Sequence, residues 1–352
     1  MILSPKKVEI FCGTGGVGKT TIATGRALNL ALTGKKVLLI TIDPAKRLKQ
    51  ILNLDENAEG KIKELSNELF EVTTPIIFHA MLMSPGATLN RIAKEKNLEV
   101  EFQTNIIKTL SRPNSGMNEI MSIIEVQYQL EKNFYDTIVL DTPPGKHFID
   151  FLESSEKIKN FFDKSFLEIF EYLGKSVSTS SKPKGLFNKL VSSGLNKLLS
   201  YLEKVTGTEF VQEFIDSVLA LYKSRDSFLK ALNFQQDLKE RSFSNWFLVT
   251  SIEQQKLSEA KELNELASKF LHDDNYLIIN KCLSDNIRNW APVRSELIQY
   301  KEALIEREEK ISSFALKNYQ NILKFHEIAD NRPLLHVKEI AEQFKIYSKE
   351  LK

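Results

Sequence analysis

The chain has 352 residues, enough for two average domains or for one α/β domain enlarged by an insertion, and its 42% hydrophobic and 27% charged residues are an ordinary globular balance. Its 48 basic and 46 acidic side chains nearly cancel, which gives no support to nucleic-acid binding, because that function normally needs a clear basic excess. The two cysteines, Cys12 and Cys282, lie far apart and suggest neither a disulfide framework nor a cysteine-rich zinc site.

The first predicted elements are a strand, a glycine-rich turn and a helix. Residues 8–12 are typical of a short buried strand, and residues 19–33 have the spacing of a helix that Gly34 closes. Residues 36–42 form an apolar run, as expected of a parallel strand covered on both faces. The early first strand leaves no room for a signal peptide, and no apolar run approaches the ~20 residues of a membrane span. We therefore expect a cytoplasmic protein.

The turn between the first strand and the first helix matches the phosphate-binding pattern G-x-x-x-x-G-K-[ST] in the context that this pattern requires. Its glycines allow backbone N–H groups to surround a phosphate, and the following helix N-terminus favours the same negative charge. Lys19 is expected to bridge the β- and γ-phosphates of ATP, and the Thr20 hydroxyl to ligate Mg²⁺. The predicted nucleotide-binding residues here are Gly13, Thr14, Gly15, Gly16, Val17, Gly18, Lys19, Thr20 and Thr21.

Three later apolar runs repeat the strand design, each followed by a polar residue. They cover residues 137–140, 247–250 and 276–279, and helical patterns separate them. Strands that alternate with helices predict an α/β fold with a doubly wound, mostly parallel sheet, whose ligands bind at the carboxyl ends of the strands. Asn280 ends the last of these runs, and its amide offers a donor and an acceptor to a purine edge.

Two longer stretches interrupt this alternation. Residues 76–130 and 148–243 are largely helical, and we interpret them as an α-helical subdomain inserted into the nucleotide-binding core. The core is then expected to comprise residues 1–75, 131–147 and 244–352.

Two aspartates at predicted strand ends are candidates for the chemistry. Asp43 could position or deprotonate the attacking water and contribute to the metal site, or it could simply cap the helix that begins after Pro44. Asp141 has the pattern of an aspartate that holds Mg²⁺ through water. The residues after it are typical of a switch loop that senses the γ-phosphate: Asp141, Thr142, Pro143, Pro144, Gly145, Lys146 and His147.

Several segments together resemble one family, the ArsA-type ATPases, which includes the arsenite-pump ATPase and the ATPase that delivers tail-anchored membrane proteins. The Asp-Pro-Ala motif and the Asp-Thr-x-Pro-x-x-His motif are the most specific, and the segments span nearly the whole chain in family order. They are residues 11–21, 41–45, 115–119 with 121–122, 141–147, 279–280 and 332–335.

The resemblance implies a P-loop ATPase that uses ATP and Mg²⁺ and works as a homodimer or as a heterodimer with a related subunit. It implies that Asp43 is the switch residue that positions the water and that residues 141–147 link the γ-phosphate to the helical subdomain. It also implies that Asn280 and the loop Arg332, Pro333 and Leu334 hold the adenine.

The sequence departs from the family in two ways. Thr14 stands where the family usually has a lysine that reaches the partner's nucleotide, so slow hydrolysis is expected unless a cation such as Lys46 or Arg47 replaces it. The zinc-binding C-x-x-C of some members and the three arsenite-binding cysteines of the pump ATPase are absent. Because trivalent arsenic needs about three soft thiolates, we reject arsenite as the substrate.

A candidate client-binding segment lies within the second helical stretch. Residues 186–202 place leucines on one helical face, and residues 174–204 carry six lysines against one glutamate. This segment could line a groove for a hydrophobic protein client or membrane-protein segment, make a peripheral membrane contact, or form ordinary core. The predicted function is a dimeric ATP-dependent switch that captures and releases such a client. The alternatives are an energising subunit of a membrane transporter and a positioning ATPase of the MinD or ParA type.

Overall fold

The computed structural model describes residues 3–42, 47–52, 54, 58–112, 117–162, 200–201 and 203–348. An eight-stranded sheet lies at its centre, in the order β3-β4-β2-β5-β1-β6-β7-β8. All neighbouring strands are parallel except β3 and β4. The strands are β1 Val8–Gly13, β2 Lys36–Thr41, β3 Ile62–Glu64, β4 Ile77–Leu82, β5 Thr137–Asp141, β6 Ser244–Ser251, β7 Tyr276–Cys282 and β8 Asn321–His326. The predicted α/β fold with a mostly parallel sheet and helical insertions is confirmed.

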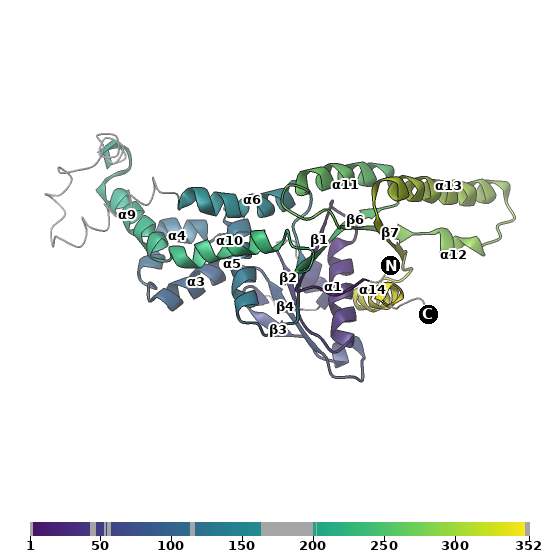
Figure 1. Cartoon of the computed structure of the whole chain (residues 1–352), viewed down its shortest axis with the longest axis horizontal. Helices are drawn as coiled ribbons and strands as arrows, with labels where there is room; N and C mark the ends of the chain where they lie inside the picture. Colours follow the sequence, from purple (N-terminus) through teal and green to yellow (C-terminus); the bar gives the residue numbers. More distant parts are fainter. Residues whose placement is uncertain are drawn as a thin grey trace. The chain divides into compact units, whose positions relative to one another are not determined.

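Helices connect the strands and continue the chain beyond them. Those joined to the sheet strands are α1 Lys19–Leu32, α2 Arg47–Leu52, α5 Asn118–Glu131, α11 Gln254–Ala267, α12 Ser284–Arg288, α13 Ser295–Asn318 and α14 Pro333–Ser348. Figure 1 shows α1 and α14 on one side of the sheet and α11 and α13 on the other. Because parallel crossovers are right-handed, the chain must cross opposite faces when it winds outward from β1 to β2 and from β6 to β7. This is the double winding that the sequence predicts.

The chain divides into two compact units, of which the first contains the whole sheet. It comprises residues 1–83, 126–152 and 234–352, and the second comprises residues 84–125 and 153–233. The second unit is helical, with α3 Pro85–Lys96, α4 Asn105–Leu110 and α9 Thr208–Lys223, and with parts of α5, α6 Lys146–Phe161 and α10 Arg225–Asp237. Among the described residues, no helix combines the length and the apolar character that crossing a bilayer requires.

The largest difference from the expected domain boundaries concerns residues 76–130. Their first part is strand β4, which pairs with β2 from Ile77 to Leu82 and therefore belongs to the sheet. The segment Ile-Phe-His-Ala-Met-Leu contains residues that suit a helix as well as a strand, so its pairing partner decides its structure. The helical unit instead begins at Ser84, where the side chain caps α3 by accepting a hydrogen bond from the Ala87 N–H.

Close packing of α1 against α14 fixes the position of the last helix. A Cβ added to Gly25 on α1 would lie 2.3 Å from the Ile340 Cγ2 atom, so only glycine allows this approach. Beside it, the buried Arg26 guanidinium donates two hydrogen bonds to Glu9, at 2.7 and 2.9 Å. Arg26 also donates to Asn29, whose amide donates to the Ala341 carbonyl of α14 at 3.0 Å. The central strand, the P-loop helix and the final helix are thus joined by one buried polar network.

Candidate nucleotide-binding site

The turn between β1 and α1 has the backbone shape of a phosphate-binding loop. Gly13 closely approaches β6, where an added Cβ would lie 2.4 Å from the Val249 carbonyl oxygen. Gly18 has φ +89°, and its added Cβ would lie 2.4 Å from the Asn280 side-chain nitrogen. At Gly15 and Gly16, by contrast, a Cβ would meet no atom within 4 Å. The loop therefore packs tightly at its two ends and leaves open space at its middle.

The N-terminus of α1 faces this loop with its donors uncapped. Its N-cap residue is Gly18, no side chain caps the first turn, and no acidic residue lies in that turn. The first N–H groups of a helix have no intrahelical partner and carry part of the positive end of the helix dipole. Thr20 and Thr21 lie in the same turn. The space beside Gly15 and Gly16 therefore suits a phosphate group, as the sequence predicts.

Lys19 and Asp141 form the charged centre of the site. Their ammonium and carboxylate groups lie 2.6 Å apart, and both residues are buried. Lys19 also donates to the Thr142 carbonyl, and the second Asp141 oxygen accepts a hydrogen bond from the Thr41 hydroxyl at 3.0 Å. The parallel register places Asp141 opposite Phe11 on one side and opposite Thr41 on the other. Sheet pairing therefore brings this distant aspartate to the P-loop lysine.

The predicted switch loop is hydrogen-bonded to β1 at Phe11 and to the first residue of the P-loop, Gly13. The Thr142 hydroxyl donates to the Phe11 carbonyl at 2.8 Å, and the Gly145 N–H donates to the Gly13 carbonyl at 3.0 Å. Helix α6 begins at Lys146, so the last two residues of the predicted switch loop form the first turn of this helix. His147 is exposed, and its Nδ1 atom lies 3.6 Å from the Asp150 carboxylate on the same helix. Pro143 and Pro144 lie between these two hydrogen-bonded residues.

Thr14, which stands in place of the family lysine, faces α11 of the same chain. Its hydroxyl is buried and forms no hydrogen bond of normal geometry with a described residue. Helix α11 places the Glu259 carboxylate close by. That carboxylate pairs with Lys256 at 2.9 Å. The hydrogen bond from Lys256 is the main reason that the pKa of Glu259 is lowered. Gln255 donates a hydrogen bond to the same carboxylate at 3.0 Å, and the Thr14 hydroxyl lies near enough to lower this pKa slightly. A negative charge therefore lies near Thr14.

A cavity of about 330 Å³ opens beside the P-loop. It extends from the P-loop across the end of β7 to the last helix of the chain. Its lining residues are Gly16, Gly18, Thr21, Ile22, Arg47, Asn280, Lys281, His326, Glu327, Ile328, His336 and Ile340. Among the lining residues after Thr21, the sequence predicts only Asn280 as a base-binding residue.

Asn280 lies in this cavity but is already engaged with the P-loop. Its amide nitrogen donates to the Val17 carbonyl at 2.8 Å, and its amide oxygen accepts no hydrogen bond from a described residue. The pairing of β7 with β8 is irregular between Ile279 and Cys282, and Lys281 has φ +62°. Such irregularities re-aim side chains next to binding sites. One N–H of the Asn280 amide is thus used by the P-loop, and its second N–H and its oxygen stay available for the predicted contact to a purine.

None of Arg332, Pro333 and Leu334 lines the cavity. Arg332 is exposed and binds the Asp330 carboxylate with two nitrogens, at 2.9 and 3.0 Å, which lowers the pKa of Asp330 to about 2. Pro333 is the first residue of α14, and Leu334 packs against the core. The loop instead positions the helix that follows it, because His336 reaches the cavity with its Nε2 atom 2.5 Å from the Asp330 carbonyl.

Some residues with predicted roles lie outside the part of the chain that the structure describes. The described side chains do not form a metal site by themselves. Asp43 and Lys46 lie outside the described residues, as do Ser115, Gly116 and nearly all of 174–204. Both cysteines are buried, and burial raises the pKa of Cys12, which disfavours the thiolate that soft metals need. Among the described residues, no group of three His, Cys, Asp or Glu side chains could hold a metal ion by itself.

The sequence comparisons give the family and the relatives of the chain. Residues 6–340 match the ArsA family, described as anion-transporting ATPases. The chain is 27% identical over 290 residues to a putative arsenical pump-driving ATPase of Aquifex aeolicus, covering 80% of this chain and 81% of the relative. It is 24% identical over 365 residues to the ATPase GET3 of Candida glabrata, covering 96% of each chain. The ATPase GET3 of Malassezia globosa is 26% identical over 219 residues, with 61% of each chain covered.

The family match spans nearly the whole chain and includes the phosphate loop, the Lys19–Asp141 pair and the cavity beside them. The resemblance expected from the short motifs is confirmed. The protein is an ATPase of the ArsA-type anion-transporting ATPase family.

Proposed function

We propose that this ATPase is a dimeric switch in which ATP binding and hydrolysis control the capture and release of a hydrophobic client, such as a segment of a membrane protein. The observation that carries the client role is an apolar surface at the start of α9 in the helical unit. Val205, Phe210 and Phe214 are 64%, 40% and 36% exposed. They follow directly on residues 186–202, whose sequence predicts an amphipathic helix. Exposed apolar surface of this kind marks sites of association.

Support for coupling comes from the connection between the switch loop and the helical unit. Gly145 is hydrogen-bonded to Gly13 of the P-loop, and α6 starts at the next residue. Helix α6 contributes residues up to Leu152 to the core and residues from Glu153 to the helical unit. A helix transmits displacement of its first turn along its length because its backbone hydrogen bonds are continuous. Rearrangement of the switch loop would therefore reach the helical unit, which carries the proposed client surface.

The phosphates of ATP would lie in the open middle of the P-loop, with Lys19 as their cation. Thr20 and Asp141 would hold Mg²⁺, which would neutralise charge on the phosphate oxygens. The Asp141 carboxylate is fixed by Lys19 and Thr41, so it is oriented before any metal binds. Asp43 is proposed to position the attacking water, and Asp43→Asn should then keep ATP affinity while lowering turnover by ~100-fold or more.

Arg47 is the proposed source of the cation that Thr14 cannot supply. It lies in the cavity wall beside Gly16, is exposed, and forms no ion pair with a described residue. We expect Arg47→Ala to lower turnover more than ATP affinity, since a cation that acts on the transition state contributes mainly to rate. Steady-state hydrolysis and calorimetric ATP binding separate the two effects.

The client role can be tested with a fluorescent apolar helical peptide, titrated with and without ATP and Mg²⁺. In Phe210→Ser/Phe214→Ser, peptide affinity should fall ~10-fold or more while ATP affinity stays unchanged. Ile346→Ser, which changes an exposed apolar residue of the core unit, serves as the matched control. Equal peptide affinity in all three proteins, or no effect of nucleotide on the wild type, would rule out the capture-and-release role.

A transporter-energising role is the second candidate, because one relative is described as driving an arsenical pump. In that case the ATPase would bind an integral membrane protein in the absence of any client. The absence of a three-thiolate site argues against arsenite itself as its substrate, since both cysteines are buried and lie on different strands. Copurification of the Asp43→Asn variant with membranes in the presence of ATP would separate the two roles.

A further inference from the structure

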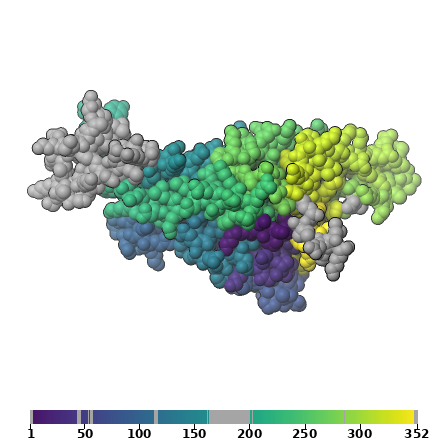
Figure 2. All heavy atoms as spheres, viewed as in Figure 1, coloured from purple at the N-terminus to yellow at the C-terminus, as the bar shows by residue number. Residues whose placement is uncertain are grey.

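A second cavity, of about 430 Å³, lies between helices α11 and α13 on the face of the sheet opposite α1 and α14 (Figure 1). Both helices reach the molecular surface, where they appear in green and yellow-green (Figure 2). This α11–α13 cavity shares no lining residue with the cavity beside the P-loop. Its volume is within the range of pockets that hold small molecules. The nucleotide site does not account for it.

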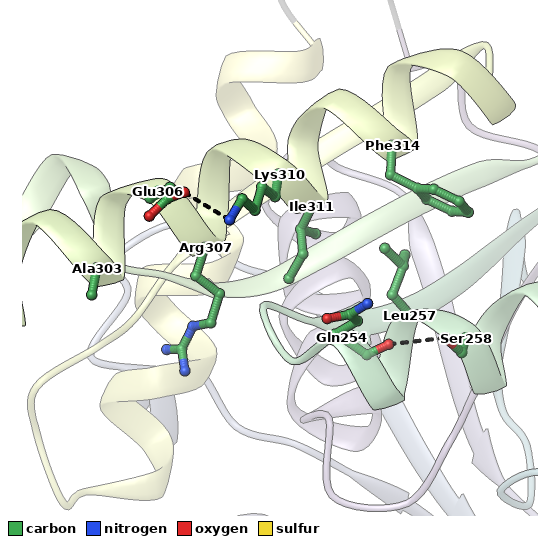
Figure 3. A pocket seen from close by; sticks show the side chains of 9 residues that line it. All are labelled: Gln254, Leu257, Ser258, Ala303, Glu306, Arg307, Lys310, Ile311 and Phe314. Carbon is green, nitrogen blue, oxygen red and sulfur yellow. Dashed lines mark hydrogen bonds and ion pairs between the residues drawn. The ribbon is translucent and has the colours of Figure 1, made fainter.

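The floor of the α11–α13 cavity is apolar. Leu257 of α11 and Ile311 of α13 are 5% and 3% exposed, and they point toward each other in Figure 3. The half-buried ring of Phe314 continues the same wall along α13. An apolar group that enters the cavity removes both its own surface and this floor from water, which is favourable. The floor therefore suits a hydrocarbon chain or an aromatic ring.

The rim of the cavity carries one positive charge that no side chain neutralises. Lys310 binds the Glu306 carboxylate on the same helix at 2.7 Å. Arg307 has no hydrogen-bond or ion-pair partner among the described residues, and α11 contributes no charged residue to the lining. In Figure 3 its guanidinium extends from the same side of α13 as Ile311. Because a guanidinium binds a carboxylate through two parallel hydrogen bonds, the rim suits a monoanion.

Both walls of the cavity are attached to the nucleotide site. Helix α11 follows β6, which packs against Gly13 of the P-loop. On α13, the residue after Arg307 is the buried Glu308, whose carboxylate accepts two hydrogen bonds from backbone N–H groups directly after β7, at 2.7 and 3.0 Å. Strand β7 carries Asn280, which lines the nucleotide cavity. A ligand that changes the separation of α11 and α13 would therefore also displace the elements that hold the nucleotide.

We infer that the α11–α13 cavity binds a small amphipathic carboxylate and that its occupancy is linked to ATP binding. The acid group lies on Arg307, and the apolar group lies against Leu257, Ile311 and Phe314. A carboxylate fits better than a phosphate monoester, which carries about −1.5 to −2 charges at neutral pH, because the rim offers one free positive charge. The inference rests neither on the client nor on the dimer of the proposed function.

The test uses 4-phenylbutyrate as the probe, titrated by calorimetry into the whole chain. Its carboxylate matches the rim of the cavity, and its phenyl group matches the floor. Arg307→Ala should weaken binding by ~10-fold or more, because a hydrogen bond between charged groups is lost. Lys317→Ala is the matched control, since Lys317 is an exposed cation of the same helix that does not line the cavity.

The neutral analogue 4-phenyl-1-butanol separates the contribution of the acid group from that of the ring. It should bind the wild type ~10-fold less tightly than 4-phenylbutyrate, and it should bind Arg307→Ala as well as the wild type. Ala303→Phe fills the cavity from an exposed position, so it should abolish binding of both probes. This variant should unfold at nearly the same temperature as the wild type, as expected for an exposed residue.

The link to the nucleotide has its own measurement. ATP with Mg²⁺ should change the affinity of the wild type for 4-phenylbutyrate by ~5-fold or more, and the probe should change the ATP affinity by the same factor. Glu308→Gln replaces the carboxylate that joins α13 to the segment after β7. In this variant the probe should still bind, but the effect of ATP on its affinity should fall below ~2-fold.

Four outcomes would overturn the inference. A dissociation constant above ~10 mM for 4-phenylbutyrate would mark its binding as adventitious. Equal affinity of the wild type and Arg307→Ala for this probe would place its acid group elsewhere. Displacement of the probe by ATP to the same extent in the wild type and in Ala303→Phe would place the probe in the nucleotide site. Equal affinity of the wild type for the probe with and without ATP would exclude the link.

Discussion

The two sides of the nucleotide site are built in different ways. The phosphate side is one continuous segment from Gly13 to Thr21, completed by Asp141 through sheet pairing. The proposed base side is the cavity that brings together Asn280, Glu327, His336 and Ile340, which come from β7, the loop after β8, and α14. The first side depends on backbone shape within a single turn. The base side depends on how α14 packs against α1. A substitution that disturbs this packing should therefore weaken binding of the base more than binding of the phosphates.

The largest expected effect is on the phosphate side. Lys19→Ala should lower the affinity for ATP and for inorganic tripolyphosphate alike, by ~1,000-fold or more, because the charge that faces the phosphates is lost. Calorimetry with both ligands measures this. The variant also leaves Asp141 buried without its partner, so Lys19→Ala/Asp141→Asn serves as the control that removes the unpaired charge. ATP affinity close to that of the wild type in both variants would contradict the site assignment.

The next effect concerns the network that joins the two sides. Arg26→Met should reduce the free energy of unfolding by ~3–5 kcal/mol, because the Glu9 carboxylate is then buried without its ion-pair partner. Glu9→Leu/Arg26→Met should recover most of this loss, since neither charge of this pair is then left in the interior. Denaturant unfolding of both variants measures the difference. A double variant that is less stable than Arg26→Met would show that the ion pair itself stabilises the fold.

Gly25→Ala should affect the base side alone. The added methyl would lie 2.3 Å from Ile340, so α14 must shift, and with it His336 and the cavity wall. We expect ATP affinity to fall ~10-fold while tripolyphosphate affinity changes less than ~2-fold, because the P-loop is untouched. Gly86→Ala is the matched control, since its Cβ meets only ordinary contacts at 3.6 and 3.7 Å. An equal loss for both ligands would show that the two sides are not separable.

The smallest effect is expected for His336. Its Nε2 atom lies against the Asp330 carbonyl, which assigns the proton to that nitrogen and leaves Nδ1 as an acceptor for a base amino group. His336→Ala should weaken ATP binding by ~3–10-fold and reduce the preference for ATP over GTP, with tripolyphosphate unaffected. Glu339→Ala, an exposed change on the same helix, is the control. An unchanged ratio of ATP to GTP affinity would exclude His336 from base recognition.

The sequence predicts the phosphate side well because its determinants are local. A glycine pattern between a strand and a helix specifies the P-loop by itself, and a polar residue after an apolar run marks the end of a strand. Asp141 and Asn280 could therefore be placed near the carboxyl ends of their strands, and the fold and family predictions are confirmed. The roles proposed for Asp43 and for residues 174–204 stay predictions, since these residues lie outside the description.

The base side could not be predicted because its residues are brought together by tertiary packing. Strand β8 is an edge strand whose alternation of buried Leu323 and Phe325 with more exposed neighbours is short, and it was not among the predicted strands. Without β8, the path of the chain to α14 is undetermined, and His336 cannot be placed. Strand β4 is equally difficult to predict from the sequence. Its residues suit a helix as well as a strand, and only pairing with β2 makes it a strand.

The position of β1 in the middle of the sheet has a consequence for synthesis on the ribosome. Strand β1 pairs with β5 on one side and with β6 on the other. Of these two neighbours, β6 (Ser244–Ser251) is synthesised later. At a typical 5–20 residues per second, β1 would wait on the order of tens of seconds with an open edge. Contacts between such distant segments also slow folding itself. A nascent chain that ends before Ser244 would expose the unpaired edge of a largely apolar strand, which makes it a substrate for chaperones or a seed for aggregation.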